Sequence, residues 1–444
     1  MKSSVIHRYI IEDRRHVPPF NEPASELTIG TKPLKIHHEE LLNDFFGQRL
    51  KLGSPLYSRS DLPQVRGTAI VYRDNLWFDR EFLAYFMAQA AREGRACRAA
   101  FRQDDKAFST YTLPLSTGFE TGLDRDGVPV YLLDLWYFPV GYAPEIVPVV
   151  VPSDAREKGF YSVPDFMTME QGDLTHYLPA RAVMSIESWV HVYFAAIIFG
   201  CFARASRLDE RIKHHNFYSL RLLWQAVLEQ KQILSTSAVI KVGKGTVIHP
   251  TAVITGPAEI GENCSIGPGV LLDNVTIGDN VTLDDGCVLM MSTLGNNCFL
   301  PFRASLYFTA LMESTIVAQN TCLQMCVVGR NSFVGAGSTF TDFNLVAQKP
   351  IRASTIDGRL GEVGQIVIGS AVGHNCRIGS GMVVYPGRMI ESDVVVVASP
   401  DRRVIMRNVT FEESDHHFIR GGDIHKRFYP RANERLADET TEKW

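Results

Sequence analysis

Aliphatic residues recur at every sixth position through much of the C-terminal half of the chain. The first run of this pattern consists of Val242, Ile248, Ile254, Ile260, Ile266 and Leu272. The spacing returns over 277–289, 316–340 and 366–396. An α-helix repeats about every 3.6 residues and a strand about every two, so neither element alone explains a period of six. Short strands joined by tight corners do explain it, because each coil of a solenoid stacks its inward residue on the coil below.

Two further positions of the repeat agree with a solenoid. Small residues such as Ala252, Cys264 and Ser332 stand two places before the aliphatic residue and suit a narrow interior. Asparagine stands three places before it in several coils, and asparagine tolerates the positive φ of a tight corner. The pattern resembles the three-sided, left-handed β-helices of the hexapeptide-repeat family, and the resemblance supplies the hand. We therefore expect a left-handed parallel β-helix over residues 238–400.

The rest of the chain divides into further segments. Residues 1–207 read as mixed α/β, so we expect an α/β domain there. A charged, leucine-rich helix is predicted to bridge to the solenoid over 208–237, and a charged tail follows over 401–444. The six-residue pattern breaks at 341–365, a polar and basic segment that is too long for a corner. Such excursions carry binding sites or cover a neighbouring subunit, and the sequence leaves both alternatives open.

Composition limits the cellular compartments and the classes of partner that are expected for this protein. A formal charge of −4 and an isoelectric point near 6.4 argue against a nucleic-acid-binding protein. The N-terminal residues lack the apolar core of a signal peptide, which predicts a cytoplasmic protein. The most apolar stretch, 189–202, is shorter than the ~20 residues of a membrane-spanning helix, so a buried helix and no membrane span are expected. The cysteine spacing predicts core packing rather than disulfides or a zinc site.

Three segments extend the resemblance to one group of enzymes. Val328–Asn344 (VGRNSFVGAGSTFTDFN) is similar to the acetyltransferase half of bifunctional N-acetylglucosamine-1-phosphate uridyltransferases. Gly30–Leu42 (GTKPLKIHHEELL) resembles a Lys-Pro-Leu segment of their nucleotidyltransferase half. Thr68–Asp79 (TAIVYRDNLWFD) resembles the strand that ends in the metal-binding aspartate of that half. The resemblance implies a divergent nucleotidyltransferase-like domain in which Lys32 contacts phosphate and Asp74 binds Mg²⁺.

The phosphate-binding loop of that family has no counterpart in this chain. In the family, backbone N–H groups of a glycine-rich loop cradle the nucleotide phosphates. Here the sequence EDRRHVPPFNEPASELTIGTKP stands in its place, and it contains no glycine before Gly30. Its prolines have no N–H to donate. The side chains of Arg14 and Arg15 offer contacts with phosphate instead.

The resemblance also implies acyl transfer from acyl-CoA in the β-helix, a reaction that uses a histidine as general base. Counting back from the Gly-Ala-Gly corner, the family's catalytic histidine falls at Gln319, which cannot act as a base. His374 is therefore the candidate catalytic residue, at a predicted corner where it would face a neighbouring subunit. Arg303, next to an aromatic pair, is the candidate for an anionic substrate group. Asp342 and Asn344 are predicted to contact the substrate.

The sequence leaves two classes of function open. The first is a homotrimeric transferase of sugar-nucleotide metabolism that acts on a phosphorylated or nucleotide-linked sugar, with Mg²⁺ and acyl-CoA. The second is a catalytically silent oligomeric scaffold that keeps the architecture of such an enzyme. A γ-type carbonic anhydrase has the same solenoid, but it holds zinc with three histidines, and the repeat region has only His249 and His374.

Overall fold

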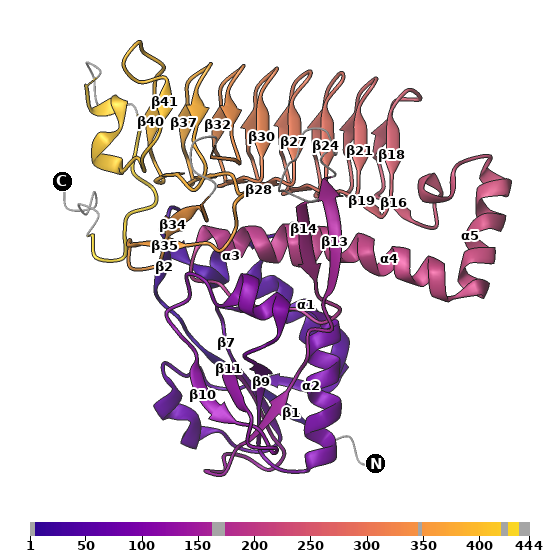
Figure 1. Ribbon diagram of the computed structural model, residues 1–444, viewed down its shortest axis with the longest axis vertical. Coiled ribbons are helices and arrows are strands. Elements are labelled where there is room, and N and C mark those ends of the chain that lie inside the picture. The colour runs from indigo at the N-terminus through magenta and orange to yellow at the C-terminus, as the bar shows by residue number, and fades with distance from the viewer. Residues whose placement is uncertain (1–4, 162–173, 345–348, 419–424, 435–444) are drawn as a thin grey trace, which may run out of the picture. The chain divides into compact units, whose positions relative to one another are not determined.

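The computed structural model describes residues 5–161, 174–344, 349–418 and 425–434 (Figure 1). These residues form two compact units. The N-terminal unit contains residues 1–14, 23–26 and 33–187, and the C-terminal unit contains residues 15–22, 27–32 and 188–444. The chain therefore passes from one unit to the other several times before residue 33. Parts of the expected segments 341–365 and 401–444 lie outside the described residues.

The N-terminal unit is built on one mixed sheet with the strand order β12–β9–β11–β7–β1–β6, and β10 pairs with β11 at its side. The strands are β1 (Ile6–Ile11), β6 (Leu50–Leu52), β7 (Ala69–Arg73), β9 (Cys97–Arg102), β10 (Glu120–Leu123), β11 (Pro129–Phe138) and β12 (Val147–Val150). β1 is parallel to both of its neighbours, β6 and β7, whereas β11 is antiparallel to β7 and β9. Outside this sheet, β8 (Leu76–Phe78) pairs with β15 (Val183–Ser185), and β13 (Arg156–Tyr161) pairs with β14 (Leu174–Leu178).

Two helices, α1 (Leu34–Phe46) and α2 (Arg80–Glu93), pack against strands of this sheet. α1 starts directly after Pro33, whose fixed φ suits the beginning of a helix. It buries one apolar stripe at helical spacing, which consists of Leu34, His38, Leu42 and Phe46. α2 begins at Asp79, whose carboxylate accepts a hydrogen bond from the Phe82 N–H, and ends at Gly94 in the left-handed conformation (φ 62°). The expected α/β domain is confirmed.

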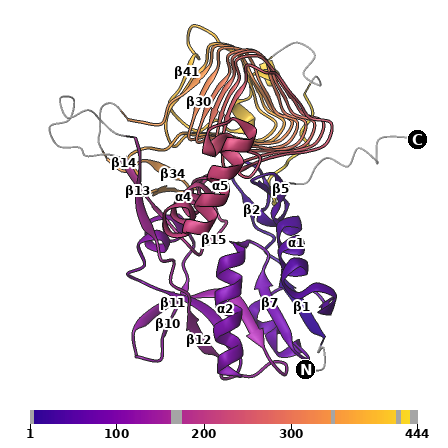
Figure 2. The same cartoon turned by 90° about the vertical axis from the view of Figure 1, so that its right-hand side faces the viewer.

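The C-terminal unit contains three parallel sheets of eight strands each, which together form the solenoid. The first sheet consists of β16 (Ile240–Val242), β19 (Ala258–Ile260), β22 (Thr276–Ile277), β25 (Thr293–Leu294), β28 (Ala310–Leu311), β31 (Val327–Val328), β36 (Ala371–Val372) and β39 (Met389–Ile390). The second consists of β17 (Val247–Ile248), β20 (Ser265–Ile266), β23 (Thr282–Leu283), β26 (Phe299–Leu300), β29 (Ile316–Val317), β32 (Phe333–Val334), β37 (Arg377–Ile378) and β40 (Val395–Val396). The third consists of β18 (Val253–Thr255), β21 (Leu271–Asp273), β24 (Val288–Met290), β27 (Ser305–Tyr307), β30 (Cys322–Gln324), β33 (Thr339–Phe340), β38 (Val383–Val384) and β41 (Val404–Ile405). Successive coils overlie one another (Figure 2).

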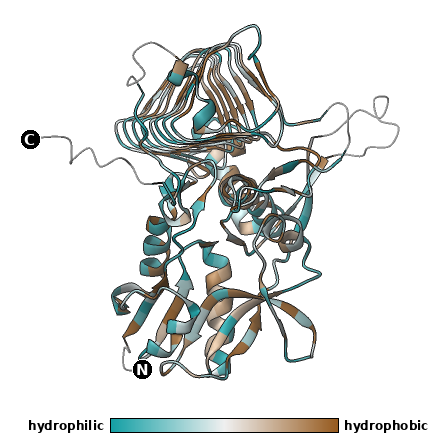
Figure 3. Cartoon of the chain, turned by 90° about the vertical axis from the view of Figure 1, so that its left-hand side faces the viewer, coloured by the Kyte–Doolittle hydropathy of each residue, from teal (hydrophilic) through white to brown (hydrophobic). Residues whose placement is uncertain are grey.

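Apolar side chains stack from coil to coil inside the solenoid. In the third sheet the paired residues are Ile254, Leu272, Leu289, Leu306, Leu323, Phe340, Val384 and Ile405. Hydrophobic and hydrophilic segments alternate around each coil (Figure 3). The predicted left-handed β-helix is confirmed. In two consecutive strands, β29 and β30, however, the inward residue lies one place later than the strict period predicts, because Val317 and Leu323 are buried while Ile316 and Cys322 are partly exposed.

The corners of the solenoid use asparagine as the sequence predicts. Asn263, Asn280, Asn297, Asn331 and Asn375 all have φ between 53° and 59°. Asparagine adopts this left-handed conformation at a lower cost than most residues other than glycine. All eight cysteines are free and seven of them are buried, so they serve as core residues.

The apolar stretch that begins at Trp189 forms a helix that lies against the first solenoid sheet. It runs through α3 (Trp189–Tyr193), the π-helical segment η5 (Phe194–Phe202) and α4 (Ala203–His214). Cys201 donates a hydrogen bond to Asn274 O (2.7 Å), and Arg204 donates one to Val275 O (3.1 Å). By length and composition this helix of 26 residues is able to cross a membrane, but 83% of its most apolar window is buried within the protein. The expected buried helix is confirmed.

A break divides the bridging helix that the sequence predicts over 208–237. α4 ends at His214, and α5 (Asn216–Glu229) follows it. The residue between them, His215, has φ −121° and ψ 86°, which is not a helical conformation. The bridge therefore consists of two helices.

The described part of the excursion at 341–365 contains a small hairpin, β34 (Arg352–Ser354) with β35 (Leu360–Glu362). The hairpin is held by its own unit. Ser188 Oγ donates a hydrogen bond to Ser354 O (2.9 Å), and Arg388 Nη2 donates one to Arg352 O (2.7 Å). This part of the segment therefore packs on the solenoid and the start of α3.

Candidate functional site

The strand order of the N-terminal sheet creates a position where ligands commonly bind. Among the described strands of this sheet, β1 alone is flanked on both sides by parallel partners, because the chain leaves β1 for β6 on one side and then returns to β7 on the other. Parallel sheets bind ligands outside the carboxyl ends of the strands at such reversal points. Two carboxylates stand there, since Asp13 follows the end of β1 and Asp74 follows the end of β7.

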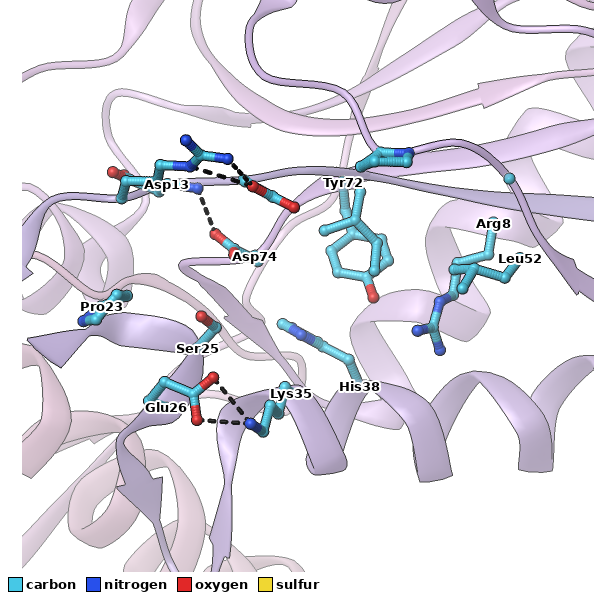
Figure 4. Close-up of a pocket in the computed structure, with 15 residues that line it drawn as sticks. Arg8, Asp13, Pro23, Ser25, Glu26, Lys35, His38, Leu52, Tyr72 and Asp74 are labelled. Atoms are coloured by element: carbon cyan, nitrogen blue, oxygen red, sulfur yellow. Dashed lines mark hydrogen bonds and ion pairs between the residues drawn. The ribbon is translucent and has the colours of Figure 1, made fainter.

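A cavity of about 460 Å³ opens beside these carboxylates (Figure 4). Its size falls within the range of small-molecule sites. Strand β1 contributes Arg8 and Ile10, β7 contributes Tyr72, and α1 contributes Lys35 and His38. The remaining lining residues are Glu12, Asp13, Arg14, Pro23, Ser25, Glu26, Leu52, Gly53, Pro55 and Asp74. All of them belong to the N-terminal unit.

Asp74 occupies the position that the sequence predicts, at the carboxyl end of a buried strand. Its Oδ1 accepts a hydrogen bond from the backbone N–H of Asp13 (2.8 Å), and its side chain also hydrogen-bonds with Ser25. Burial raises the pKa of Asp74 to about 6, and the neighbouring Asp13 carboxylate acts in the same direction. The carboxyl group is therefore held in place at the edge of the cavity.

The acidic end of the cavity suits a magnesium ion that is shared with a substrate. Among the described residues, no group of three or more His, Cys, Asp or Glu side chains is arranged to hold a metal ion. Mg²⁺ does not need such a cage, because it is usually bound through one or two carboxylates, with waters and substrate phosphates completing the shell. Asp74, with Asp13 beside it, fits this kind of site.

The basic side chains around the cavity are of two kinds. Lys35 Nζ lies 2.6 Å from a Glu26 oxygen, and Arg14 Nη2 lies 2.9 Å from a Glu12 oxygen, so both cations are paired with carboxylates. Arg8 is different. No hydrogen bond or ion pair joins its guanidinium group to any described residue, and its Nε is buried.

Two buried aromatic side chains separate Arg8 from the carboxylates in Figure 4. The Nε2 atom of His38 donates a hydrogen bond to the carbonyl oxygen of Leu76 (2.8 Å). Burial lowers the pKa of His38 to about 3, so its ring is neutral at physiological pH. Tyr72 is also buried, and burial raises the pKa of its hydroxyl group. Neither group brings a negative charge to Arg8.

Lys32, the predicted phosphate contact, lies outside this cavity. It is exposed and belongs to the C-terminal unit, whereas Asp74 belongs to the N-terminal unit. Burial acts to raise the pKa of Glu259, but nearby cations, Lys241 first and Lys32 among them, hold that pKa below its usual value. The positive charge of Lys32 therefore acts on a carboxylate of the C-terminal unit.

The structure places His374 differently from the exposed corner that the sequence predicts. Its side chain is fully buried within the C-terminal unit, with its ring packed between Phe20 (5.1 Å between ring centres) and Tyr429 (4.7 Å). Its Nδ1 accepts a hydrogen bond from the backbone N–H of Arg330 (2.9 Å), so the ring proton lies on Nε2. That atom is 3.3 Å from Glu22 Oε2. The expectation of a histidine facing a neighbouring subunit is corrected, because residues 15–22 of the same chain cover it.

The other predicted solenoid residues lie at separate corners. Arg303 is exposed and has φ 60° at the corner between β26 and β27. Asp342 is half-buried, burial raises its pKa, and its carbonyl oxygen accepts a hydrogen bond from the Ile368 N–H. Asn344 is exposed. Within the described parts of the chain, no hydrogen bond or ion pair joins Arg303, Asp342 and His374 to one another.

Comparison with known proteins agrees with the architecture of the solenoid. The family profile described as "Bacterial transferase hexapeptide (six repeats)" matches residues 240–274. The C-terminal unit is a hexapeptide-repeat β-helix. The "Bifunctional protein GlmU" of Heliobacterium modesticaldum is 31% identical over 170 residues, which cover 36% of this chain and 36% of that protein. The chain thus spans about a third of the length of this curated relative.

A solved structure, described as the polysialic acid O-acetyltransferase OatWY, is 19% identical to this chain. The match covers 40% of this chain and 82% of that one, with a TM-score of 0.18.

Asp13, Lys35 and Arg8 line the cavity but were not predicted from the sequence. Asp13 reaches Asp74 only because β1 and β7 pair in parallel, a contact across 61 positions of the chain. Lys35 lies on α1, three positions after the predicted Lys32, so the motif was found but the lysine that borders the cavity was not. Arg8 did leave a signal, which is a charged residue in the middle of the strand sequence IHRYII.

Proposed function

We propose that the chain is a transferase of sugar-nucleotide metabolism whose N-terminal unit binds a phosphorylated or nucleotide-linked sugar. The observation that carries the proposal is the pair of carboxylates, Asp13 and Asp74, at the carboxyl ends of two adjacent parallel strands beside a cavity of about 460 Å³. The similarity to the bifunctional relative supports the class of reaction. The substrate and the reaction type are part of the proposal.

In this proposal Asp74 is the principal metal ligand, and Asp13 helps to fix its position through the backbone hydrogen bond. When bound, Mg²⁺ would neutralise the substrate phosphates. Lys35 borders the same end of the cavity through α1, where its pairing with Glu26 orients the ammonium group. Lys32 stays a predicted phosphate contact, although it does not line this cavity.

Acyl transfer from acyl-CoA in the β-helix is the second part of the proposal. Arg303, Asp342 and Asn344 are its candidate substrate contacts. His374 can serve as its base only after residues 15–22 leave the imidazole, because Glu22 and Phe20 now cover it. A movement of this segment is therefore a requirement of acyl transfer by His374.

Ligand binding to the full-length protein tests the first part. Nucleoside triphosphates with Mg²⁺, sugar 1-phosphates, nucleotide sugars and acyl-CoA are compared by thermal shift. A ligand at 100 times its dissociation constant should stabilise the fold by about 2.7 kcal/mol. We expect a shift with nucleotide and Mg²⁺ that is lost in D74N and retained in D44N, which removes an exposed carboxylate of α1 outside the cavity. Equal shifts in the two variants would contradict the role of Asp74.

A scaffold that has lost the chemistry is the alternative, and two observations favour it. No glycine-rich loop follows β1, so backbone N–H groups are not gathered to hold phosphates. His374, the buried one of the two histidines in the repeat region, is enclosed by its own chain. The scaffold would bind no member of the ligand panel and would form no product from a nucleoside triphosphate and a sugar 1-phosphate.

The proposal also includes a cytoplasmic homotrimer. Eight free cysteines suit a reducing compartment. The helix α5 carries exposed apolar side chains, including Phe217 and Trp224, which are 84% and 64% exposed in the single chain. Contiguous apolar surface of this kind marks a contact with another protein surface. Light scattering of the purified protein measures the number of copies.

A further inference from the structure

An arginine stands in the middle of a strand where its neighbours are apolar. Arg8 is in β1, with Leu52 of β6 and Ile70 of β7 as its partners in register. A cation in such a position costs stability unless an anion accompanies it. No described residue forms an ion pair or hydrogen bond with its guanidinium group, and its Nε is buried. The fold supplies a positive charge without its counter-charge.

The pairing of the strands places the Arg8 side chain on the face of the sheet that lines the cavity. Side chains of Arg8, Ile10 and Tyr72 share one face of the sheet, because Arg8 alternates with Ile10 along β1 and Ile10 pairs with Tyr72. This face lines the cavity. In Figure 4, Tyr72 and His38 lie between Arg8 and the carboxylates Asp13 and Asp74. The cavity is therefore acidic at one end and basic at the other.

We propose that Arg8 binds a phosphoryl group of the substrate from the face of the sheet, in place of a glycine-rich loop. The inference rests on the proposed function for the class of substrate. A guanidinium group matches the oxygens of a phosphoryl group with two parallel hydrogen bonds. The neighbouring Tyr72 and His38 exclude water from one side, and neither carries a charge that competes for the anion. The substrate thus lies with its anionic group at Arg8 and its metal-binding group at Asp74.

The test uses inorganic phosphate, pyrophosphate and a sugar 1-phosphate as probes, without metal, on the full-length protein. Binding is measured by calorimetry and by the shift in melting temperature. We expect R8M to weaken pyrophosphate binding at least about tenfold, the effect of losing a charge-assisted hydrogen-bonded pair. R92M is the matched control, because Arg92 is an exposed arginine of α2 that does not line the cavity. It should bind as the wild type does.

The melting temperature of the unliganded protein gives a second readout. Arg8 is partly exposed and only its Nε is buried, so replacement of this unpaired cation by an apolar side chain of similar length should leave the fold as stable or more stable. R8M should therefore melt at or above the wild-type temperature while it loses phosphate binding. A lower melting temperature would mean that Arg8 has a structural partner and would overturn the inference. R8K, which keeps the charge but not the paired donors, should bind more weakly than wild type and more tightly than R8M.

The outcomes separate this inference from the proposed function. If the wild type responds to none of the three probes, or if R8M responds as the wild type does, the inference is wrong. If binding that depends on Arg8 is present but no nucleotidyl product forms with Mg²⁺, the inference stands and the proposed transferase function is wrong. If R8M forms product at the wild-type rate, the transferase stands and the inference fails. A response to the sugar 1-phosphate but not to free phosphate identifies a sugar-linked phosphoryl group as the ligand.

Discussion

At the scale of single residues, Glu22 has the largest predicted effect on stability. Its carboxylate lies 2.9 Å from Arg330 Nη1 and 3.3 Å from His374 Nε2, and the imidazole is fully buried. Removal of one partner of a buried charged pair leaves the other without compensation. We expect E22Q to lower the free energy of unfolding by about 3 kcal/mol, measured by chemical denaturation.

A matched variant separates this effect from a general change in net charge. E262Q removes an exposed carboxylate of the same solenoid and should leave the free energy of unfolding within about 0.5 kcal/mol of the wild type. If E22Q proves equally harmless, Arg330 and His374 do not depend on Glu22. That result would also remove the physical reason for the burial of His374.

Buried histidines give the protein a predictable dependence on pH. Burial lowers the pKa of His38 and of His176 to about 3, whereas an unfolded histidine titrates near 6.5. Between these values the unfolded state binds more protons than the folded state, so stability falls as the pH falls below about 6.5. Each histidine contributes a slope of at most about 1.4 kcal/mol per pH unit. The pKa of Glu22 is also lowered, so its contribution is lost further toward acid pH.

The variant H176Q tests how much one buried histidine contributes to the dependence of stability on pH. His176 accepts or donates a hydrogen bond at 2.8 Å with the Tyr111 hydroxyl group, and glutamine keeps a polar partner there. The free energy of unfolding is measured at pH 7.5, 6.5 and 5.5. Below pH 6.5 the free energy of unfolding of H176Q should fall less steeply with falling pH than that of the wild type. The difference should approach the contribution of one proton, about 1.4 kcal/mol per pH unit. An unchanged slope would mean that His176 is protonated in the folded protein.

At the scale of elements, helix α5 presents an apolar stripe with heptad spacing. The stripe consists of Phe217, Leu220, Trp224 and Val227, all more than 60% exposed in the single chain. Successive spacings of three and four residues are typical of helices that pair with like helices. We therefore expect this face to contact the α5 of another copy in the proposed homotrimer. The substitution W224E should lower the number of copies measured by light scattering.

The neighbouring helix offers the control for that experiment. K213E introduces the same acidic side chain at an exposed position of α4, outside the stripe. It should leave the assembly unchanged. A W224E protein with the wild-type number of copies would show that α5 takes no part in the assembly.

The same scale explains why the solenoid was predictable and its details were not. The coils repeat a local chemical pattern, an apolar residue inside and in several coils an asparagine at a corner, so the sequence alone indicates the fold. The shift at Val317 and Leu323 was missed because Ile316 and Cys322 also satisfy the expected residue type. Only the stacking of each coil on its neighbours decides which of two apolar residues points inward.

At the scale of the whole molecule, the candidate site depends on contacts between distant parts of the chain. Asp74 was predictable because a single segment resembles a known strand and its terminal aspartate. Asp13 and Arg8 come to line the same cavity as Asp74 because β1 pairs in parallel with β7. No local sequence pattern predicts this pairing. His374 was placed at an exposed corner because the residues that bury it are distant in sequence: Phe20 and Glu22 precede it by more than 350 positions, and Tyr429 follows it.

That long-range burial leads to a prediction about the C-terminal unit. Residues 15–22 and 27–32 belong to it, although they lie far from the rest of it in sequence. They supply Phe20 and Glu22 to His374, and Thr28 Oγ1 donates a hydrogen bond to Glu313 (2.7 Å). Ser392 Oγ also donates a hydrogen bond to the Pro19 carbonyl oxygen (2.9 Å). A fragment of residues 188–444 lacks all of these contacts.

We therefore expect the fragment 188–444 to melt at a lower temperature alone than in the presence of the segment that it lacks. A synthetic peptide of residues 15–32 should raise the melting temperature of the fragment in a concentration-dependent way, because a ligand that binds only the folded state stabilises it. The same peptide with Glu22→Gln should raise it less, since the partner of Arg330 and His374 is then neutral. If the two peptides act equally, the charge of Glu22 contributes nothing to the stabilisation by this segment. If neither acts, the solenoid folds without the N-terminal segment, and the cover over His374 opens at little cost.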